Sequence, residues 1–197
     1  MTVTTAMIKD LRAATGAGVM DCKKALETSN GDIARAQEIL KERGLAKAAK
    51  KEGRATTQGL VEAYVHMGRV AALVELNCET DFVARTPAFR ELAHDLAMQV
   101  VASSPQYVRP EEIPPEVLEA EKRDYRMQMA AQSKPEHVLE KIIEGKLNKF
   151  YEEVCLLKQA FIKDQDRTVQ ELITEKIASL GENIVLRRFV RMELAES

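Results

Sequence analysis

The chain has no strong excess of charge, few cysteines and no long hydrophobic run, and each absence excludes a class of protein. Its 29 Lys and Arg and 31 Asp and Glu leave a net charge of -2, which gives no general attraction to nucleic acid or to an anionic membrane. Cys22, Cys78 and Cys155 have no zinc-type spacing and are typical of free thiols in a reducing compartment. No stretch has the length of a membrane span, and no charged-then-apolar leader opens the chain. We therefore expect a cytoplasmic protein whose partner is another protein, with no direct nucleic acid or membrane contact.

Motifs for catalysis and for nucleotide or metal binding are absent as well. The sequence contains no G-x-G-x-x-G, no Gly-rich loop ending in Lys-Ser or Lys-Thr, no His-Glu-x-x-His and no G-x-S-x-G. The triplet Gly16-Ala17-Gly18 comes closest, but it follows a predicted helix instead of a strand and is interpreted as a turn. The histidines have no metal-ligand spacing, so no metal, no cofactor and no enzymatic activity is predicted. The basic run from Lys41 to Arg54 lacks interleaved aromatic residues and is interpreted as a solvated helix face.

Residues 1–44 predict a small domain of three short helices. Apolar residues recur there at helical spacing, and glycines interrupt the pattern between helices. The expected caps and stops are Thr4 or Thr5, Gly16, Asp32 and Gly44. Residues 45–56 follow as an Ala- and Lys-rich segment with helical propensity but little to bury, which predicts a basic helical linker.

After the linker, the spacing of apolar residues changes from a helical period to alternation with a period of two residues. Residues 60–66 and 70–76 flank Met67-Gly68 and predict a β-hairpin. Residues 184–194 return to alternation and predict a third strand, most simply added to the hairpin. The apolar residues that share one face of each strand are Val61, Ala63 and Val65, then Val70, Ala72, Val74 and Leu76, and finally Ile184, Leu186, Val190, Met192 and Leu194, interrupted only by Arg188.

Helical patterns make up the rest of residues 57–197. Pro87 stands where the first turn of a helix tolerates proline, and residues 169–180 predict another helix. Two long charged patterns joined near Ser133-Lys134-Pro135 predict an antiparallel helical hairpin over about residues 116–154. The expected fold class is α+β, with the three-helix domain, the helical linker, a core whose three-stranded antiparallel sheet is packed by helices, and a protruding helical hairpin.

Two apolar pairs stand at positions that are normally polar. Phe82-Val83 follows Asp81 on the connection between a predicted strand and a predicted helix, and Val19-Met20 opens a helix directly after a glycine. Each pair is either an anchor in the protein's own core or an exposed anchor for a partner. Spacing alone leaves both interpretations open.

Longer motifs around these pairs resemble bacterial elongation factor Ts in its short form. The motifs are Thr15-Gly16-Ala17-Gly18-Val19-Met20-Asp21-Cys22-Lys23-Lys24-Ala25-Leu26, Asn77-Cys78-Glu79-Thr80-Asp81-Phe82-Val83-Ala84-Arg85, and near the C-terminus Gly181-Glu182-Asn183-Ile184 with Arg187-Arg188-Phe189. The resemblance runs the whole length of the chain. It implies a guanine-nucleotide exchange factor for the translational GTPase elongation factor Tu, with an N-terminal domain of the ubiquitin-associated type, a core and a coiled-coil-like arm.

The resemblance also implies roles for individual residues. The residues that match the family's motif for entering the GTPase and displacing its magnesium are Thr80, Asp81, Phe82 and Val83. Val19 and Met20 match the region that contacts the partner's nucleotide domain. Longer family members carry the core unit twice, whereas this chain holds one, so we expect a homodimer that rebuilds the missing half.

Two functions of other classes stay open at this point. In one, the N-terminal domain is an adaptor that binds short peptides while the core is a scaffold. In the other, Cys78, His66 and Asp81, expected near one end of the hairpin, form the nucleophile, base and orienting acid of a thiol hydrolase. A cysteine at a strand end is usually inert packing, which favours a structural role for Cys78.

Overall fold

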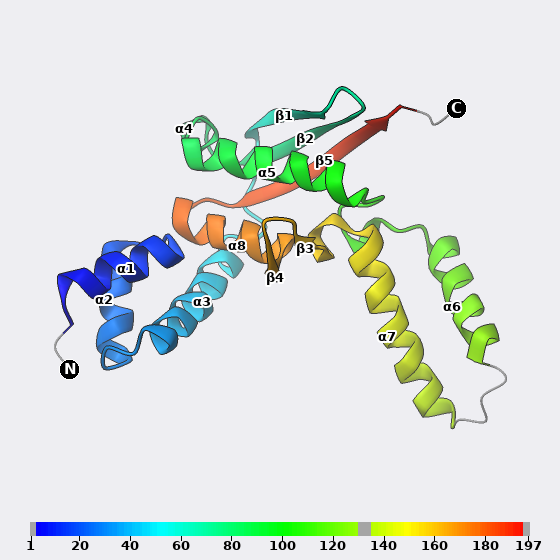
Figure 1. Cartoon of the computed structure of the whole chain (residues 1–197), viewed down its shortest axis with the longest axis horizontal. Helices are drawn as coiled ribbons and strands as arrows, with labels where there is room; N and C mark the ends of the chain where they lie inside the picture. The colour runs from blue at the N-terminus through cyan, green and yellow to red at the C-terminus, as the bar shows by residue number, and fades with distance from the viewer. Residues whose placement is uncertain (1–2, 130–134, 195–197) are drawn as a thin grey trace. The chain divides into compact units, whose positions relative to one another are not determined.

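The computed structural model describes residues 3–129 and 135–194, which form an α+β fold (Figure 1). Its three-stranded sheet has the order β1-β2-β5, with β1 at Gln58–His66, β2 at Val70–Cys78 and β5 at Ile184–Glu193. The hairpin, the added third strand and the α+β class are thereby confirmed. The chain forms two compact units: unit 1 holds Met1–Leu60, Leu76–Leu92 and Glu171–Val185, and unit 2 holds Val61–Glu75, Ala93–Gln170 and Leu186–Ser197.

Unit 1 begins with the helices α1 (Thr5–Thr15), α2 (Val19–Thr28) and α3 (Ile33–Ala49). The predicted caps are confirmed, because Thr4 accepts a hydrogen bond from the Met7 amide at 3.3 Å and Asp32 accepts one from the Arg35 amide at 3.0 Å. Gly16 ends α1 with a φ of 65°, a left-handed conformation that glycine adopts without strain. The buried core of these helices consists of Leu11, Cys22, Ala25, Leu26, Ala36 and Leu40.

The predicted end of the third helix at Gly44 is wrong, since α3 continues to Ala49. The residues that follow Gly44 are good helix formers, and they keep the backbone helical. Gly44 itself faces Ala178 of α8 (Val169–Leu180): a Cβ built on Gly44 would lie 3.5 Å from the Ala178 Cβ. A side chain there would make an ordinary van der Waals contact, and the glycine does not stop the helix. Residues 45–49 of the predicted linker belong to α3.

Unit 1 also contains the end of β2, helix α4 (Asp81–Ala84), the start of α5 (Pro87–Ser103) and most of α8. Helix α4 follows β2, and α5 opens at the predicted proline. Helix α8 stops before Gly181, whose φ of 84° and amide bond to the Ile177 carbonyl, at 3.0 Å, confirm the predicted stop. In β1, Gly59 has a φ of 153°, and any Cβ there would clash with the Leu76 carbonyl oxygen. Only glycine therefore fits where β1 passes the end of β2.

A tight turn in unit 2 joins the strands of the hairpin. Its central residues Met67 and Gly68 have φ values of 49° and 68°, and the Arg69 amide donates to the His66 carbonyl at 2.9 Å. Two successive positive φ angles are the mark of a type I′ turn, whose twist matches that of the strands.

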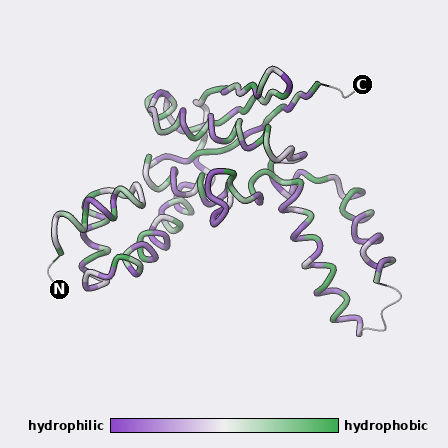
Figure 2. The backbone as a smooth tube through the Cα atoms, in the orientation of Figure 1, coloured by the Kyte–Doolittle hydropathy of each residue, from purple (hydrophilic) through white to green (hydrophobic). Residues whose placement is uncertain are grey.

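The predicted helical hairpin is present in unit 2. Helices α6 (Pro115–Met129) and α7 (Glu136–Val154) lie side by side and run in opposite directions (Figure 1), and Figure 2 shows hydrophilic and hydrophobic residues interspersed along both. Lys146 of α7 joins them, with a hydrogen bond to Gln128 at 2.9 Å and its ammonium 4.9 Å from the centre of the Tyr125 ring. Most of the predicted joint near Ser133-Lys134-Pro135 lies outside the described residues.

Several short elements of unit 2 were not predicted. They are the 3₁₀ turns η1 (Pro110–Glu112) and η2 (Leu156–Lys158) and the two-stranded sheet of β3 (Ala160–Phe161) and β4 (Asp164–Thr168). A small core of Ile113, Val154 and Cys155 lies at the end of α7. No helix in residues 3–129 and 135–194 is long and apolar enough to cross a bilayer.

The apolar residues predicted to share one face of β5 differ in burial along the strand. Ile184 and Leu186 are buried, whereas Val190, Met192 and Leu194 are exposed. Burial changes at Arg188, which donates a hydrogen bond to Glu75 of β2 at 2.6 Å. Alternation divides a strand into two faces but does not say which face other elements cover at each point.

Exposed apolar side chains also lie on β1 and β2 in unit 2. The Arg188–Glu75 contact and the bond from the Leu194 amide to the Arg69 carbonyl, at 2.9 Å, set a register in which Val190 lies opposite Leu73. Both side chains point away from the buried face of β2. We call this surface the open face of the sheet; it consists of Val61, Val65, Leu73, Val190 and Met192.

Candidate functional site

The segment after β2 is a single helical turn, where the sequence predicted only a connection. Thr80 adopts an extended backbone, and its hydroxyl accepts a hydrogen bond from the Val83 amide at 3.4 Å, so that it caps α4. Thr86 accepts a hydrogen bond from the Phe89 amide at 3.3 Å and so leads the chain into α5. Polar side chains thus supply the partners that the backbone at each helix start requires.

Within this turn, Phe82 points outward and Ala84 points inward. The Phe82 side chain is 81% exposed, whereas Ala84 is 7% exposed and Val83 is half-buried. Of the two interpretations of the Phe82-Val83 pair, the core anchor is therefore wrong for Phe82. Asp81 forms an ion pair with Arg85 at 2.9 Å, one turn further along. The site presents a bare aromatic ring beside a carboxylate that already has a cationic partner.

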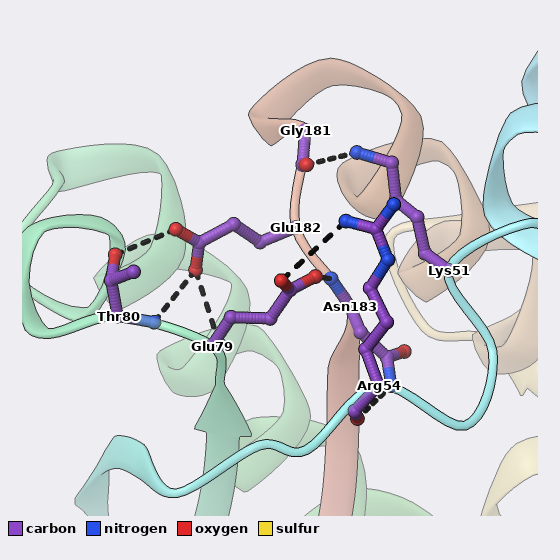
Figure 3. Close-up of polar contacts among 7 residues, drawn as sticks. All are labelled: Lys51, Arg54, Glu79, Thr80, Gly181, Glu182 and Asn183. Atoms are coloured by element: carbon purple, nitrogen blue, oxygen red, sulfur yellow. Dashed lines mark hydrogen bonds and ion pairs between the residues drawn. The ribbon is translucent and has the colours of Figure 1, made fainter.

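A polar cluster in unit 1 holds the start of this turn (Figure 3). The Glu182 carboxylate accepts hydrogen bonds from the Glu79 amide at 3.1 Å, the Thr80 amide at 3.0 Å and the Thr80 hydroxyl at 2.6 Å. Glu182 comes from the short connection between α8 and β5, about a hundred residues away in sequence. Hydrogen bonds to an ionised carboxylate are stronger than those between neutral groups.

Contacts in the opposite direction complete the cluster. The Glu79 carboxylate accepts a hydrogen bond from the Asn183 amide at 2.6 Å and pairs with Arg54 at 3.6 Å. The buried Asn183 side chain donates to the Arg54 carbonyl at 3.0 Å, and Lys51 donates to the Gly181 carbonyl (Figure 3). Each glutamate therefore accepts from the backbone of the other's segment. We call Glu79, Thr80, Glu182 and Asn183 the Glu182 clamp.

Sequence reasoning did not find the clamp. Residues 181–184 were noted only as part of a motif that resembles a family, without a role for Glu182. A charged residue in a connection is ordinary, so Glu182 gave no local sign of a specific contact. Its partners lie too far away in sequence for spacing to identify them.

The second predicted pair is also exposed. Val19 and Met20 are the first two residues of α2, with 48% and 62% of their surfaces accessible, while Cys22 at the end of the first turn is fully buried. Asp21, which follows Met20, pairs with Lys47 of α3 at 2.8 Å. Here too the core interpretation is wrong, and the start of α2 offers an apolar surface with a salt bridge beside it.

The geometry speaks against the thiol-hydrolase interpretation. Cys78 is fully buried and its thiol donates to the Thr80 carbonyl at 3.1 Å. Burial, with a further contribution from the charge of Glu182, raises the pKa of Cys78 and disfavours the thiolate. His66 ends β1 at the turn, whereas Cys78 ends β2 away from that turn, so the expectation that they lie near one end of the hairpin is wrong.

The described site contains no group with activated chemistry. Across residues 3–129 and 135–194, no three His, Cys, Asp or Glu side chains are grouped so that they could hold a metal ion. What the arrangement offers is recognition: an aromatic ring and a carboxylate on a turn that a carboxylate clamp anchors, and an apolar helix start.

Comparison with known proteins identifies the family. The model of the Elongation factor TS family matches residues 2–176. Elongation factor Ts of Carboxydothermus hydrogenoformans is 57% identical over 195 residues, which cover 98% of this chain and 90% of the relative. Elongation factor Ts of Moorella thermoacetica is 59% identical over 195 residues, 98% of this chain and 96% of the relative, and that of Thermodesulfovibrio yellowstonii is 53% identical over 197 residues, 100% and 98%. The chain belongs to the elongation factor Ts family.

Proposed function

We propose that the chain is a cytoplasmic guanine-nucleotide exchange factor that binds elongation factor Tu, both loaded with GDP and free of nucleotide, and promotes GDP release and GDP/GTP exchange during translation elongation. The observation that carries the proposal is the 81% exposed Phe82 ring on an anchored turn, in a chain of this family. A soluble domain that holds a large aromatic side chain in water uses it most simply as a contact for a partner.

Exchange requires differential binding and no bond chemistry. If the chain binds the empty GTPase more tightly than the GDP-loaded form, linkage requires that it weakens GDP binding by the same factor. This thermodynamic route needs neither a nucleophile nor a metal or cofactor of its own. The proposal therefore includes no enzymatic step on a substrate.

The proposed mechanism uses the residues of the turn as a wedge. Phe82, supported by Val83, enters between elements of the GTPase and shifts its phosphate loop and the ligands of its bound magnesium. Asp81 exchanges its ion pair with Arg85 for groups that this shift uncovers. Thr80 keeps the turn capped while the ring is engaged. The exposed Val19 and Met20 supply a second contact, with the nucleotide domain.

We also propose that two copies associate through the open face of the sheet. Its five apolar side chains, all in unit 2, are exposed in a single copy, and they lie on a sheet that has only three strands. Contact between the open faces of two copies removes apolar surface from water. Because both copies use the same surface, the contact is isologous, as in a two-fold symmetric dimer.

The central experiment measures release of labelled GDP from purified elongation factor Tu. We expect the wild-type chain to accelerate GDP release. Phe82→Ala should weaken the binding free energy to elongation factor Tu by about 2 kcal/mol or more, which is roughly a 30-fold loss of stimulation at low concentration. The matched control is Met67→Ala, which truncates an 84% exposed side chain at the hairpin turn. Unchanged stimulation by Phe82→Ala would refute the wedge, and a folded variant that still binds but no longer stimulates would support it.

A further inference from the structure

Within the Glu182 clamp, the Glu182 carboxylate binds the start of the turn that carries Phe82. Glu182 accepts hydrogen bonds from the Glu79 and Thr80 amides and from the Thr80 hydroxyl, at 3.1, 3.0 and 2.6 Å. These amides directly precede α4, where a helix start leaves donors without partners inside the helix. Glu182 therefore holds the two residues whose backbone sets the orientation of α4.

Thr80 connects Glu182 to Phe82. Its hydroxyl donates to Glu182 and at the same time accepts from the Val83 amide at 3.4 Å, the cap of α4. Because α4 has only four residues, it has almost no stability of its own: fixing a first helical turn costs conformational entropy that few hydrogen bonds offset. A fixed Thr80 rotamer supplies the missing constraint.

We infer that Glu182 is a positioning residue: it holds Thr80 in its capping geometry and thereby presents the Phe82 ring in a binding-ready orientation before the partner arrives. The inference rests on the proposed exchange function. Without the clamp, only a fraction of free molecules has the turn formed, and the apparent affinity for the partner falls by that fraction. Once the complex has formed, the partner itself can order the turn.

The surroundings keep Glu182 in place independently of Phe82. The neighbouring Asn183 is bound at its amide by Glu79, at 2.6 Å, and through its side chain to the Arg54 carbonyl, at 3.0 Å (Figure 3). A change of the Glu182 carboxylate to an amide of the same shape leaves these contacts in place. Glu182→Gln therefore removes charge at the clamp while the segment around it stays anchored.

The test titrates the full-length chain against elongation factor Tu loaded with labelled GDP. We expect Glu182→Gln to raise the concentration for half-maximal stimulation about fivefold, since neutral hydrogen bonds replace charge-assisted ones, and Glu182→Ala to raise it further. The release rate at saturation should stay near the wild-type value. The control Glu119→Gln alters an exposed carboxylate of α6 that pairs with Lys122 at 2.8 Å, and it should shift neither quantity.

A double-mutant cycle separates positioning from general weakening. If Glu182 acts through the ring, Glu182→Gln should have little further effect in a Phe82→Ala background. Amide hydrogen exchange of the free chain should show faster exchange at Glu79 and Thr80 in Glu182→Ala, with melting temperature and circular dichroism of Glu182→Gln close to wild type.

The possible results lead to distinct conclusions. Wild-type titration curves for both Glu182 variants would overturn the inference while leaving the exchange function intact, as would equal losses with and without Phe82. A wild-type chain that does not accelerate GDP release would overturn the proposed function, and the role of Glu182 in exchange with it.

Discussion

Phe82 and Ala84, two residues apart on α4, have opposite environments. Ala84 is buried, whereas the ring of Phe82 is exposed to water. A buried Phe side chain typically contributes about 2 to 3 kcal/mol to folding, and this chain forgoes that contribution at position 82. Truncation of Phe82 should therefore leave folding stability nearly unchanged, which is what allows its effect on nucleotide release to be attributed to binding.

The buried thiol of Cys155 should make folding stability depend on pH. Burial, with the charges of Glu111 and Glu112, raises the pKa of this thiol from 9.0 to about 11. Above pH 9 the unfolded chain loses the proton while the folded chain retains it, so stability falls as pH rises from about 9 to about 11. The difference in unfolding free energy between wild type and Cys155→Ala should narrow by roughly 1 to 2 kcal/mol over this range, measured by urea denaturation. A constant difference would contradict the assignment.

The turn of the β-hairpin contains Met67 in a backbone conformation that is unfavourable for methionine. Met67 has a φ of 49°, a conformation that non-glycine side chains other than Asn and Asp rarely adopt, and its apolar side chain is exposed. The following glycine and the strand register hold it there. The strand pairing, and not the residue's own preference, therefore determines the conformation of this turn.

Met67→Asn should stabilise the fold by about 0.5 to 1 kcal/mol, because Asn-Gly is the preferred pair for a type I′ turn. Thermal or chemical denaturation would measure the gain. The control is Met127→Asn, an equally conservative change of an exposed methionine in helix α6, which should give no gain because Asn is a poorer helix former. Equal shifts in both variants would mean that loss of an exposed apolar group, and not turn geometry, is the cause.

At the scale of the whole molecule, the proposal that two copies associate through the open face leads to a prediction of the oligomeric state. We expect wild-type chain to sediment as a dimer at micromolar concentration. Val190→Lys should shift it to monomer, since a charge in the middle of an apolar contact is costly to desolvate. Met127→Lys, which adds the same charge on α6, should remain dimeric. A monomeric wild type would contradict the proposed assembly.

Local patterns in the sequence predicted much of the fold. Caps such as Thr4 and Asp32, the stop at Gly181 and the two-residue period around Met67-Gly68 are short-range signals, and the structure confirms each. Gly44 misled because a glycine that stops a helix and one that lies inside a helix look alike in sequence. The difference in burial along β5 depends on which elements cover the sheet, information that alternation does not contain.

The candidate site was predictable only in part. The apolar pairs at residues 19–20 and 82–83 stood out by their unusual positions, but their exposure is a property of packing and not of spacing. The Glu182 clamp joins segments about a hundred residues apart, so only the folded backbone brings its partners together. Long-range polar contacts of this kind carry no periodic pattern.

The outward ring at position 82 has a practical consequence, because the chain contains no tryptophan. In Phe82→Trp the new indole would be the only one in the molecule, seated in water at the contact through which we propose that nucleotide release is triggered. Its fluorescence would report docking in real time, without any attached dye.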